Sequence, residues 1–77
     1  MDVLGVFGRA IKSLRLEKGL TQEELAYECQ LHRTYISGIE QGTRNVSLIN
    51  IIKISKALKV TPSQLLKCLD NTDERVI

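Results

Sequence analysis

Apolar residues recur every three or four positions through most of the 77-residue chain, which is the period of an α-helix. In the first such segment Phe7, Ile11 and Leu14 follow this spacing, and we expect a helix from about Val3 to Lys18. Gly19 then supplies the residue that most readily adopts the left-handed backbone found at helix ends. No stretch alternates with a period of two, so the pattern predicts an all-α fold without a β-sheet.

Capping residues divide the rest of the chain into four further helices. Thr21 with Glu24 three positions later forms a capping box, and Thr61 precedes Pro62 at a first helical position. Ser47 is a third N-cap. The expected helices are Gln22 to about Cys29, Arg33 to about Gln41, Leu48 to about Leu58, and Pro62 to Leu69 before a polar end over 70–75. Residues 1–77 suffice for one compact five-helix domain and not for two cores.

The short spacing between the second and third helices predicts a helix-turn-helix. Only Gln30, Leu31 and His32 separate the two, and small Ala26 permits a close crossing. Once the apolar residues of the third helix face the core, its N-terminal end presents polar side chains outward: Arg33, Thr34, Tyr35 and Ser37. Side chains at this end of such a helix reach base edges in the major groove. The pattern therefore predicts binding to double-stranded DNA.

The charge distribution agrees with such a partner. Residues 1–60 carry nine Lys or Arg against six Asp or Glu, a net of +3, whereas 61–77 carry two against three, a net of −1. A solvated basic surface is an equally good interpretation of charge alone. Two separated cysteines and one histidine cannot build an ordinary zinc site, so we expect no metal or cofactor and reduced thiols in a cytoplasmic protein. The sequence contains no phosphate-binding loop and no nucleophile motif, so we do not expect an enzyme. It also contains no apolar run long enough to span a membrane, so we expect no membrane partner.

Two segments carry a family resemblance. LRLEKGLTQEELA (14–26) and LHRTYISGIEQGTRNVSL (31–48) resemble the lambda-repressor-like, or XRE-type, helix-turn-helix family, and are most similar to controller proteins of restriction–modification systems. The resemblance implies a transcription regulator of its own gene and of the endonuclease gene. A phage-type repressor and the DNA-binding subunit of an antitoxin are alternatives, and a protein-interaction module is an alternative of another class.

The resemblance also implies roles for single residues. Gln22 would bond a phosphate, Arg33 would read a guanine, and Thr34, Tyr35 and Ser37 would offer further contacts to bases or phosphate. In the following loop, Arg44 and Asn45 would lie along the backbone of the DNA. Alternatives stay open: Arg33 as a phosphate clamp, Tyr35 as half-buried packing, Ser37 as a solvent-facing residue and Asn45 as a plain turn residue.

The scaffold residues that the resemblance implies are Arg15 and Glu40, which would pair and fix the angle of the third helix. Two positions depart from the family pattern. Gln30 occupies a turn position where glycine is usual, which predicts backbone strain if the left-handed conformation is kept. His32 stands where serine usually caps the third helix. By the same resemblance Glu23 and Glu28 are candidates for an RNA polymerase contact, although charged helix faces are usually just solvated.

The last two helices carry more apolar surface than one small core requires. Leu48, Ile51, Ile52, Ile54 and Leu58 span a wide face of the fourth helix, and Ile49 lies outside this face. Because one recognition helix covers few base pairs, specificity requires two of them, about 34 Å apart. We therefore expect a homodimer on a pseudo-palindromic operator, with residues 48–70 as interface and Ile49 and Leu66 in it. The alternative is that these helices only complete the monomer core.

Overall fold

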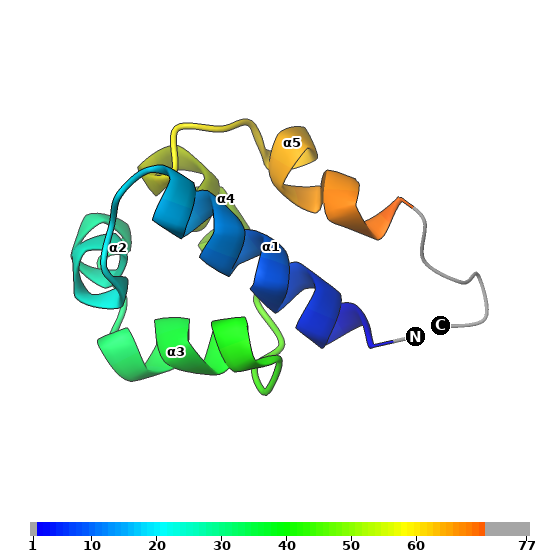
Figure 1. The fold of residues 1–77 in the computed structure, drawn as a ribbon, viewed down its shortest axis with the longest axis horizontal. Helices are drawn as coiled ribbons and strands as arrows, with labels where there is room; N and C mark the ends of the chain where they lie inside the picture. Colours follow the sequence, from blue (N-terminus) through cyan, green and yellow to red (C-terminus); the bar gives the residue numbers. More distant parts are fainter. Residues whose placement is uncertain (1, 71–77) are drawn as a thin grey trace.

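The computed structural model describes residues 2–70 as helices joined by short turns (Figure 1). The elements are α1 (Val3–Glu17), α2 (Gln22–Cys29), α3 (Arg33–Gln41), α4 (Leu48–Ala57), α5 (Pro62–Leu66) and the 3₁₀ turn η1 (Lys67–Leu69). No strand occurs among the described residues, which confirms the all-α expectation. None of these helices is long and apolar enough to cross a membrane. The polar end expected over 71–75 lies outside the described residues.

Local capping explains where the helices begin. The Thr21 hydroxyl accepts from the Glu24 backbone N–H at 3.0 Å, and the Glu24 carboxylate accepts from the Thr21 N–H at 2.8 Å. Thr61 forms the same reciprocal box with Gln64. The fifth helix departs from expectation, because its α-helical part ends at Leu66 and continues as a 3₁₀ turn. Such tightening is common in the last turn of a helix.

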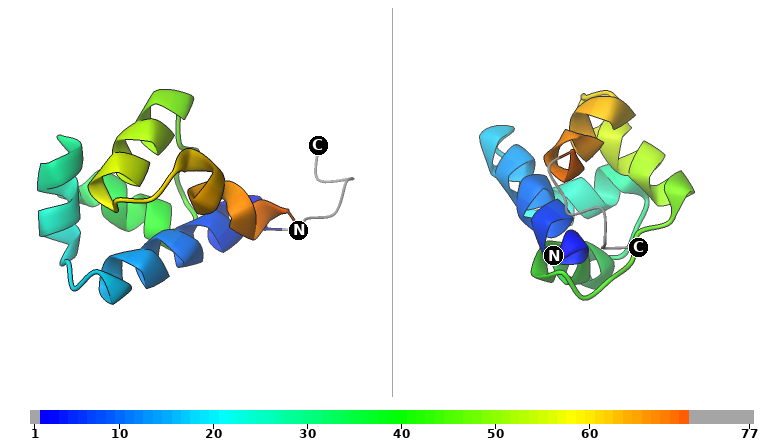
Figure 2. Two further views of the ribbon diagram at one scale, coloured as in Figure 1. Left: turned by 90° about the horizontal axis from the view of Figure 1, so that it is seen from above. Right: turned by 90° about the vertical axis from the view of Figure 1, so that its right-hand side faces the viewer.

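The core lies between α1, α3, α4 and α5, and α2 closes one end of it with buried Leu25, Ala26 and Cys29 (Figure 2). Its fully buried side chains include Ile11, Ile36, Ile39, Ile54 and Leu58. The structure corrects the expected face of α4, because Leu48 is 73% exposed. At 3.6 residues per turn, Leu48 lies about 120° around the helix from Ile54, which sets the inward direction.

Helices α1 and α3 approach so closely that glycine is required at their crossing. A Cβ atom at Gly8 would lie 2.1 Å from the carbonyl oxygen of Ile39, a distance that no side chain tolerates. One turn earlier, Gly5 lies against Gly42, which ends α3 with a φ of +78°. Because backbone meets backbone here, α3 has little freedom to slide or tilt on α1.

Candidate nucleic-acid interface

The turn before α3 keeps the geometry of a helix-turn-helix despite its unusual residues. Gln30 adopts the left-handed conformation with a φ of 58°, and the Leu31 N–H donates to the carbonyl oxygen of Ala26 at 2.9 Å. His32 caps α3, because its ring Nδ1 accepts from the Thr34 backbone N–H at 3.1 Å. The imidazole nitrogen therefore occupies the place of a serine oxygen. Gln30 keeps the left-handed conformation for which the sequence predicts strain.

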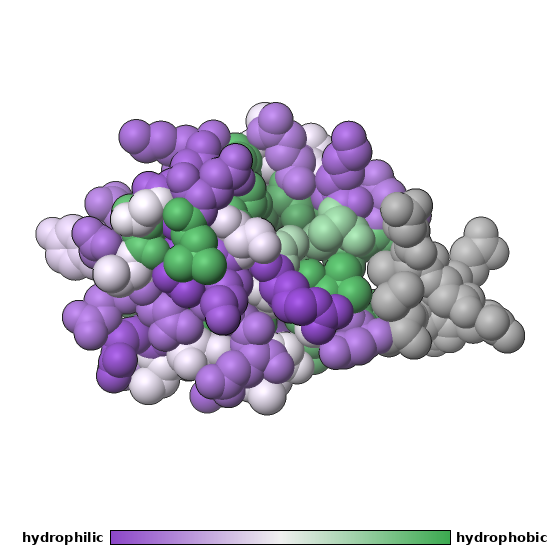
Figure 3. Space-filling model, viewed as in Figure 1, coloured by the Kyte–Doolittle hydropathy of each residue, from purple (hydrophilic) through white to green (hydrophobic). Residues whose placement is uncertain are grey.

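The N-terminal half of α3 carries the polar surface. Arg33 and Thr34 are exposed, and Tyr35 and Ser37 are half-buried. The Arg33 guanidinium lies 3.9 Å from the Glu23 carboxylate, but both side chains are mostly exposed, and such a pair contributes about 0–1 kcal/mol. Arg33 can therefore exchange this partner for another anion. Figure 3 shows the surface over α3, along the lower edge, as mainly hydrophilic.

A buried ion pair holds the other end of α3. Arg15 Nε donates to Glu40 Oε2 at 2.6 Å, and a second guanidinium nitrogen donates to Oε1 at 3.0 Å. Their side chains are only 8% and 3% exposed, and the hydrogen bond to Glu40 raises the pKa of Arg15. A third guanidinium nitrogen donates to the carbonyl oxygen of Leu20 at 2.8 Å. These hydrogen bonds of the Arg15 guanidinium join α1, α3 and the turn before α2.

Gln22 joins the same cluster. Its Nε2 donates to Glu40 Oε1 at 3.0 Å, and its side chain is half-buried. An amide nitrogen carries two hydrogens, so one remains for an acceptor outside the protein. The backbone N–H of this first α2 residue also lacks a partner within the helix. Gln22 can thus contact a phosphate with these two groups while it stays bonded to Glu40.

The loop after α3 folds back over that helix. The Thr43 hydroxyl and backbone N–H both donate to the carbonyl oxygen of Gly38, at 3.1 and 2.9 Å. The Arg44 guanidinium then lies 5.9 Å from the centre of the Tyr35 ring, within cation–π range. A Cβ atom at Gly38 would lie 2.6 Å from Arg44 Cγ, so glycine makes room for this side chain. Asn45 beside it is exposed.

Comparisons with known proteins agree with this geometry. The model of the helix-turn-helix family matches residues 11–65. The control protein C.BamHI of Bacillus amyloliquefaciens is 63% identical over 62 residues, which cover 79% of this chain and 76% of that protein. The crystal structure of the restriction-modification controller protein C.AhdI from Aeromonas hydrophila matches with a TM-score of 0.79 and 48% identity, covering 80% of this chain and 94% of that one. The structure of the controller protein C.Esp1396I matches with a TM-score of 0.79 and 45% identity, over 87% and 88% of the two chains.

The chain belongs to the helix-turn-helix family. Its similarity to several controller proteins confirms the family resemblance found in the sequence, and the matched structures confirm the fold. The family is one of DNA-binding regulators and not of enzymes.

One polar residue of this helix-turn-helix protein was missed by the sequence analysis. Asn50, in the first turn of α4, donates through Nδ2 to the Tyr35 hydroxyl oxygen at 3.2 Å. The sequence signal was an amide within the otherwise apolar run LINII (48–52). Its partner lies in another helix, so helical spacing alone could not identify the contact.

The surface of α4 also exposes apolar side chains. Leu48 and Ile49 are 73% and 70% exposed at its N-terminal end, and Leu66 on α5 is half-buried. On α2, Glu23 and Glu28 are exposed, as is Tyr27 between them. Adjacent exposed leucine and isoleucine side chains are typical of a contact surface.

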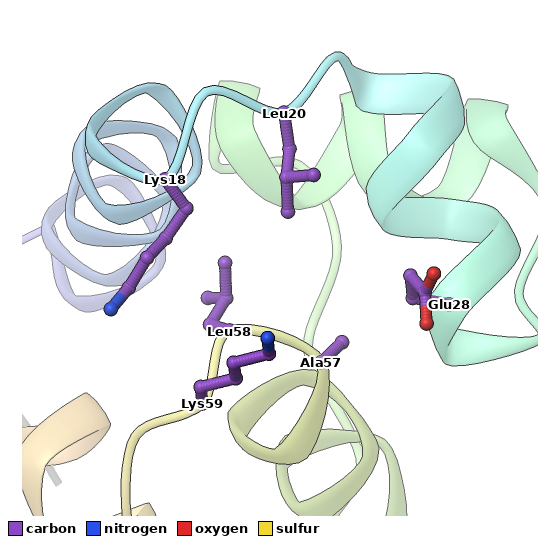
Figure 4. Close-up of a pocket in the computed structure, with 6 residues that line it drawn as sticks. All are labelled: Lys18, Leu20, Glu28, Ala57, Leu58 and Lys59. Atoms are coloured by element: carbon purple, nitrogen blue, oxygen red, sulfur yellow. The ribbon is translucent and has the colours of Figure 1, made fainter.

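A pocket at the C-terminal ends of α1, α2 and α4 offers no comparable chemistry. Leu20 and Leu58 point into it, and Lys18, Glu28 and Lys59 stand at its rim (Figure 4). Within the part of the chain that the structure describes, no buried side-chain polar atom lacks a hydrogen-bond partner, and no cluster of metal-ligating residues occurs. The polar face of α3 remains the best candidate site.

Proposed function

We propose that this protein binds double-stranded operator DNA as a homodimer and thereby regulates its own gene and the endonuclease gene of a restriction–modification system. The observation that carries the proposal is the polar end of α3, where Arg33, Thr34 and Tyr35 project from a helix that is anchored at its other end by Glu40. The similarity to controller proteins supports the system in which it acts. The natural site of action is the cytoplasm, and we assign no catalytic step.

The proposed contacts to DNA are of two kinds, contacts to base edges and contacts to the DNA backbone. Arg33 reads guanine O6 and N7 in the major groove, and Thr34, Tyr35 and Ser37 add hydrogen bonds to bases or phosphate. Gln22 and the loop residues Arg44 and Asn45 hold the DNA backbone on either side. Positioning contacts of this kind fix the register, whereas base contacts select the sequence.

A dimer would place two such helices on successive turns of the DNA. The exposed Leu48 and Ile49 and the half-buried Leu66 supply an apolar face for a two-fold contact between copies of this chain. Glu23 and Glu28 on the exposed face of α2 are proposed to contact RNA polymerase when the protein activates transcription.

The DNA-reading proposal is tested by selecting bound duplexes from a random pool and titrating the complex with salt. The wild-type chain should enrich one pseudo-palindromic sequence, and Arg33→Ala should relax one position in each half-site at a cost of about 1–3 kcal/mol. Lys12→Ala removes the same charge from an exposed position of α1, outside α3 and outside residues 48–70, and should change little. Failure of the wild type to enrich any sequence would refute specific recognition.

The dimer is tested by sedimentation at micromolar concentration. The wild type should sediment with twice the monomer mass of 8.7 kDa, and Ile49→Asp should sediment as a monomer. Leu16→Asp is the matched control, because Leu16 is also an exposed apolar residue, at 58%, but lies on α1. A monomeric wild type, or an Ile49→Asp variant that stays dimeric, contradicts the proposed interface.

A further inference from the structure

The Tyr35 side chain is held from two directions before any DNA is present. Arg44 covers one face of its ring at 5.9 Å, and Asn50 Nδ2 donates to its hydroxyl oxygen at 3.2 Å. Tyr35 lies on α3, whereas Arg44 comes from the following loop and Asn50 from α4. Both Tyr35 and Asn50 are half-buried, so these contacts are shielded in part from water.

Asn50 is itself well placed to orient the phenol. Its backbone N–H donates to the Ser47 hydroxyl at 3.2 Å, which caps α4. The same helix is anchored in the core by fully buried Ile54. The amide therefore approaches Tyr35 from a rigid element, and the side chain needs little ordering to make the bond.

The direction of this hydrogen bond determines what the phenol can do next. A tyrosine hydroxyl has one hydrogen to donate and an oxygen that accepts. When the oxygen accepts from Asn50, the hydrogen remains for another partner, and among residues 2–70 no group accepts it. The Tyr35 hydroxyl therefore remains available as a hydrogen-bond donor.

We infer that Asn50 is a positioning residue that makes Tyr35 a hydrogen-bond donor toward DNA. This inference rests on the proposed function. The DNA partner of the Tyr35 hydroxyl is an acceptor atom: a major-groove oxygen or N7 of a base, or a phosphate oxygen. The amino groups of adenine and cytosine are donors and do not fit this role. Specificity at the base that faces Tyr35 then depends on a residue of α4 that need not touch the DNA.

The test compares base preferences after selection from random duplexes. Tyr35→Phe should lose preference at one position in each half-site. Asn50→Asp should lose the base preference at that same position. A carboxylate can only accept, so in this variant the Tyr35 hydroxyl would donate its hydrogen to the introduced carboxylate and not to the DNA. Asn50→Ala should weaken binding about two- to tenfold, since the phenol must then be ordered on binding. In the Tyr35→Phe background, Asn50→Ala should have no further effect.

Ser47→Asp is the matched control for the added charge. Aspartate also caps a helix, and the substitution places the same negative charge three residues earlier. It should weaken binding to all sequences alike without changing the preferred bases. If Tyr35→Phe and Asn50→Asp also weaken all sequences alike, but more than Ser47→Asp does, the acceptor is a phosphate oxygen and the inference stands in that form.

Two results separate failure of the inference from failure of the proposed function. If Tyr35→Phe alters the preferred bases while both Asn50 variants keep the wild-type preference and affinity, the positioning role is wrong and DNA reading stands. If the wild type enriches no sequence, the proposed function itself fails. Urea midpoints measured for all variants show whether a loss of binding reflects unfolding.

Discussion

Removal of the Glu40 carboxylate is expected to be the most damaging single change in the scaffold. Three N–H groups donate to it: two of the Arg15 guanidinium, at 2.6 and 3.0 Å, and Nε2 of Gln22, at 3.0 Å. Glu40→Ala would leave these donors without their acceptor. Two of them belong to the Arg15 side chain, which is only 8% exposed. A buried charge that loses its partner in this way costs about 3–5 kcal/mol.

That cost is large against the stability of so small a domain. At about 0.05–0.15 kcal/mol per residue, 77 residues give a free energy of unfolding of roughly 4–12 kcal/mol. Glu40→Ala should therefore leave the protein marginal or unfolded at 25 °C. The double variant Arg15→Met with Glu40→Leu should recover most of the loss, because apolar residues of similar volume often replace a buried pair at little cost.

The assay is urea unfolding followed by far-UV circular dichroism. Wild type, Glu40→Ala, the single variants Arg15→Met and Glu40→Leu, and the double variant are compared at one protein concentration, because dimerisation would make stability depend on concentration. The double-mutant cycle then isolates the coupling between Arg15 and Glu40. A loss below about 1 kcal/mol for Glu40→Ala would show that the pair contributes no more than an exposed one.

Three other changes follow from the structure. Gly8→Ala should destabilise by about 1–3 kcal/mol in the same unfolding assay, because its Cβ would meet the Ile39 carbonyl; unchanged stability would contradict the close crossing. Gln30→Gly should raise stability by about 1 kcal/mol by relieving its left-handed backbone, and a loss would contradict that strain. Burial raises the pKa of the Cys29 thiol to about 11 from 9.0. Because the folded state holds this proton more tightly, stability should be complete below about pH 9 and fall by on the order of 2 kcal/mol toward pH 11, whereas Cys29→Ala should abolish that step.

Helix ends were predictable because their causes lie within a few residues. Thr21 and Glu24 form their capping box across three positions, and the sequence displays both partners together. The apolar period likewise predicted that Ile11 and the apolar residues of the third helix face the core, and Ile11, Ile36 and Ile39 are buried there. These inferences need no knowledge of how the helices pack.

Contacts between helices were predictable only in part. The pairing of Arg15 with Glu40, 25 residues apart, came from the family resemblance and not from any spacing within the chain. The contact between Tyr35 and Asn50 had no such guide, since it depends on where α4 crosses α3. Exposure of Leu48 was missed for the same reason, because a wide apolar face does not reveal which part of it turns inward.

The position of α3 is set by residues from every neighbouring element. Arg15 of α1 and Gln22 of α2 hold its C-terminal end through Glu40, and Asn50 of α4 holds the phenol near its N-terminal end. A hydrogen bond or base contact loses strength steeply once the geometry shifts, so the angle of the helix matters as much as its residues. Specificity for DNA is therefore expected to change with substitutions at these supporting positions even when Arg33 and Thr34 are untouched. Asn50 directly follows the exposed Ile49. The face proposed for dimerisation and the residue proposed to position Tyr35 therefore lie in one turn of α4.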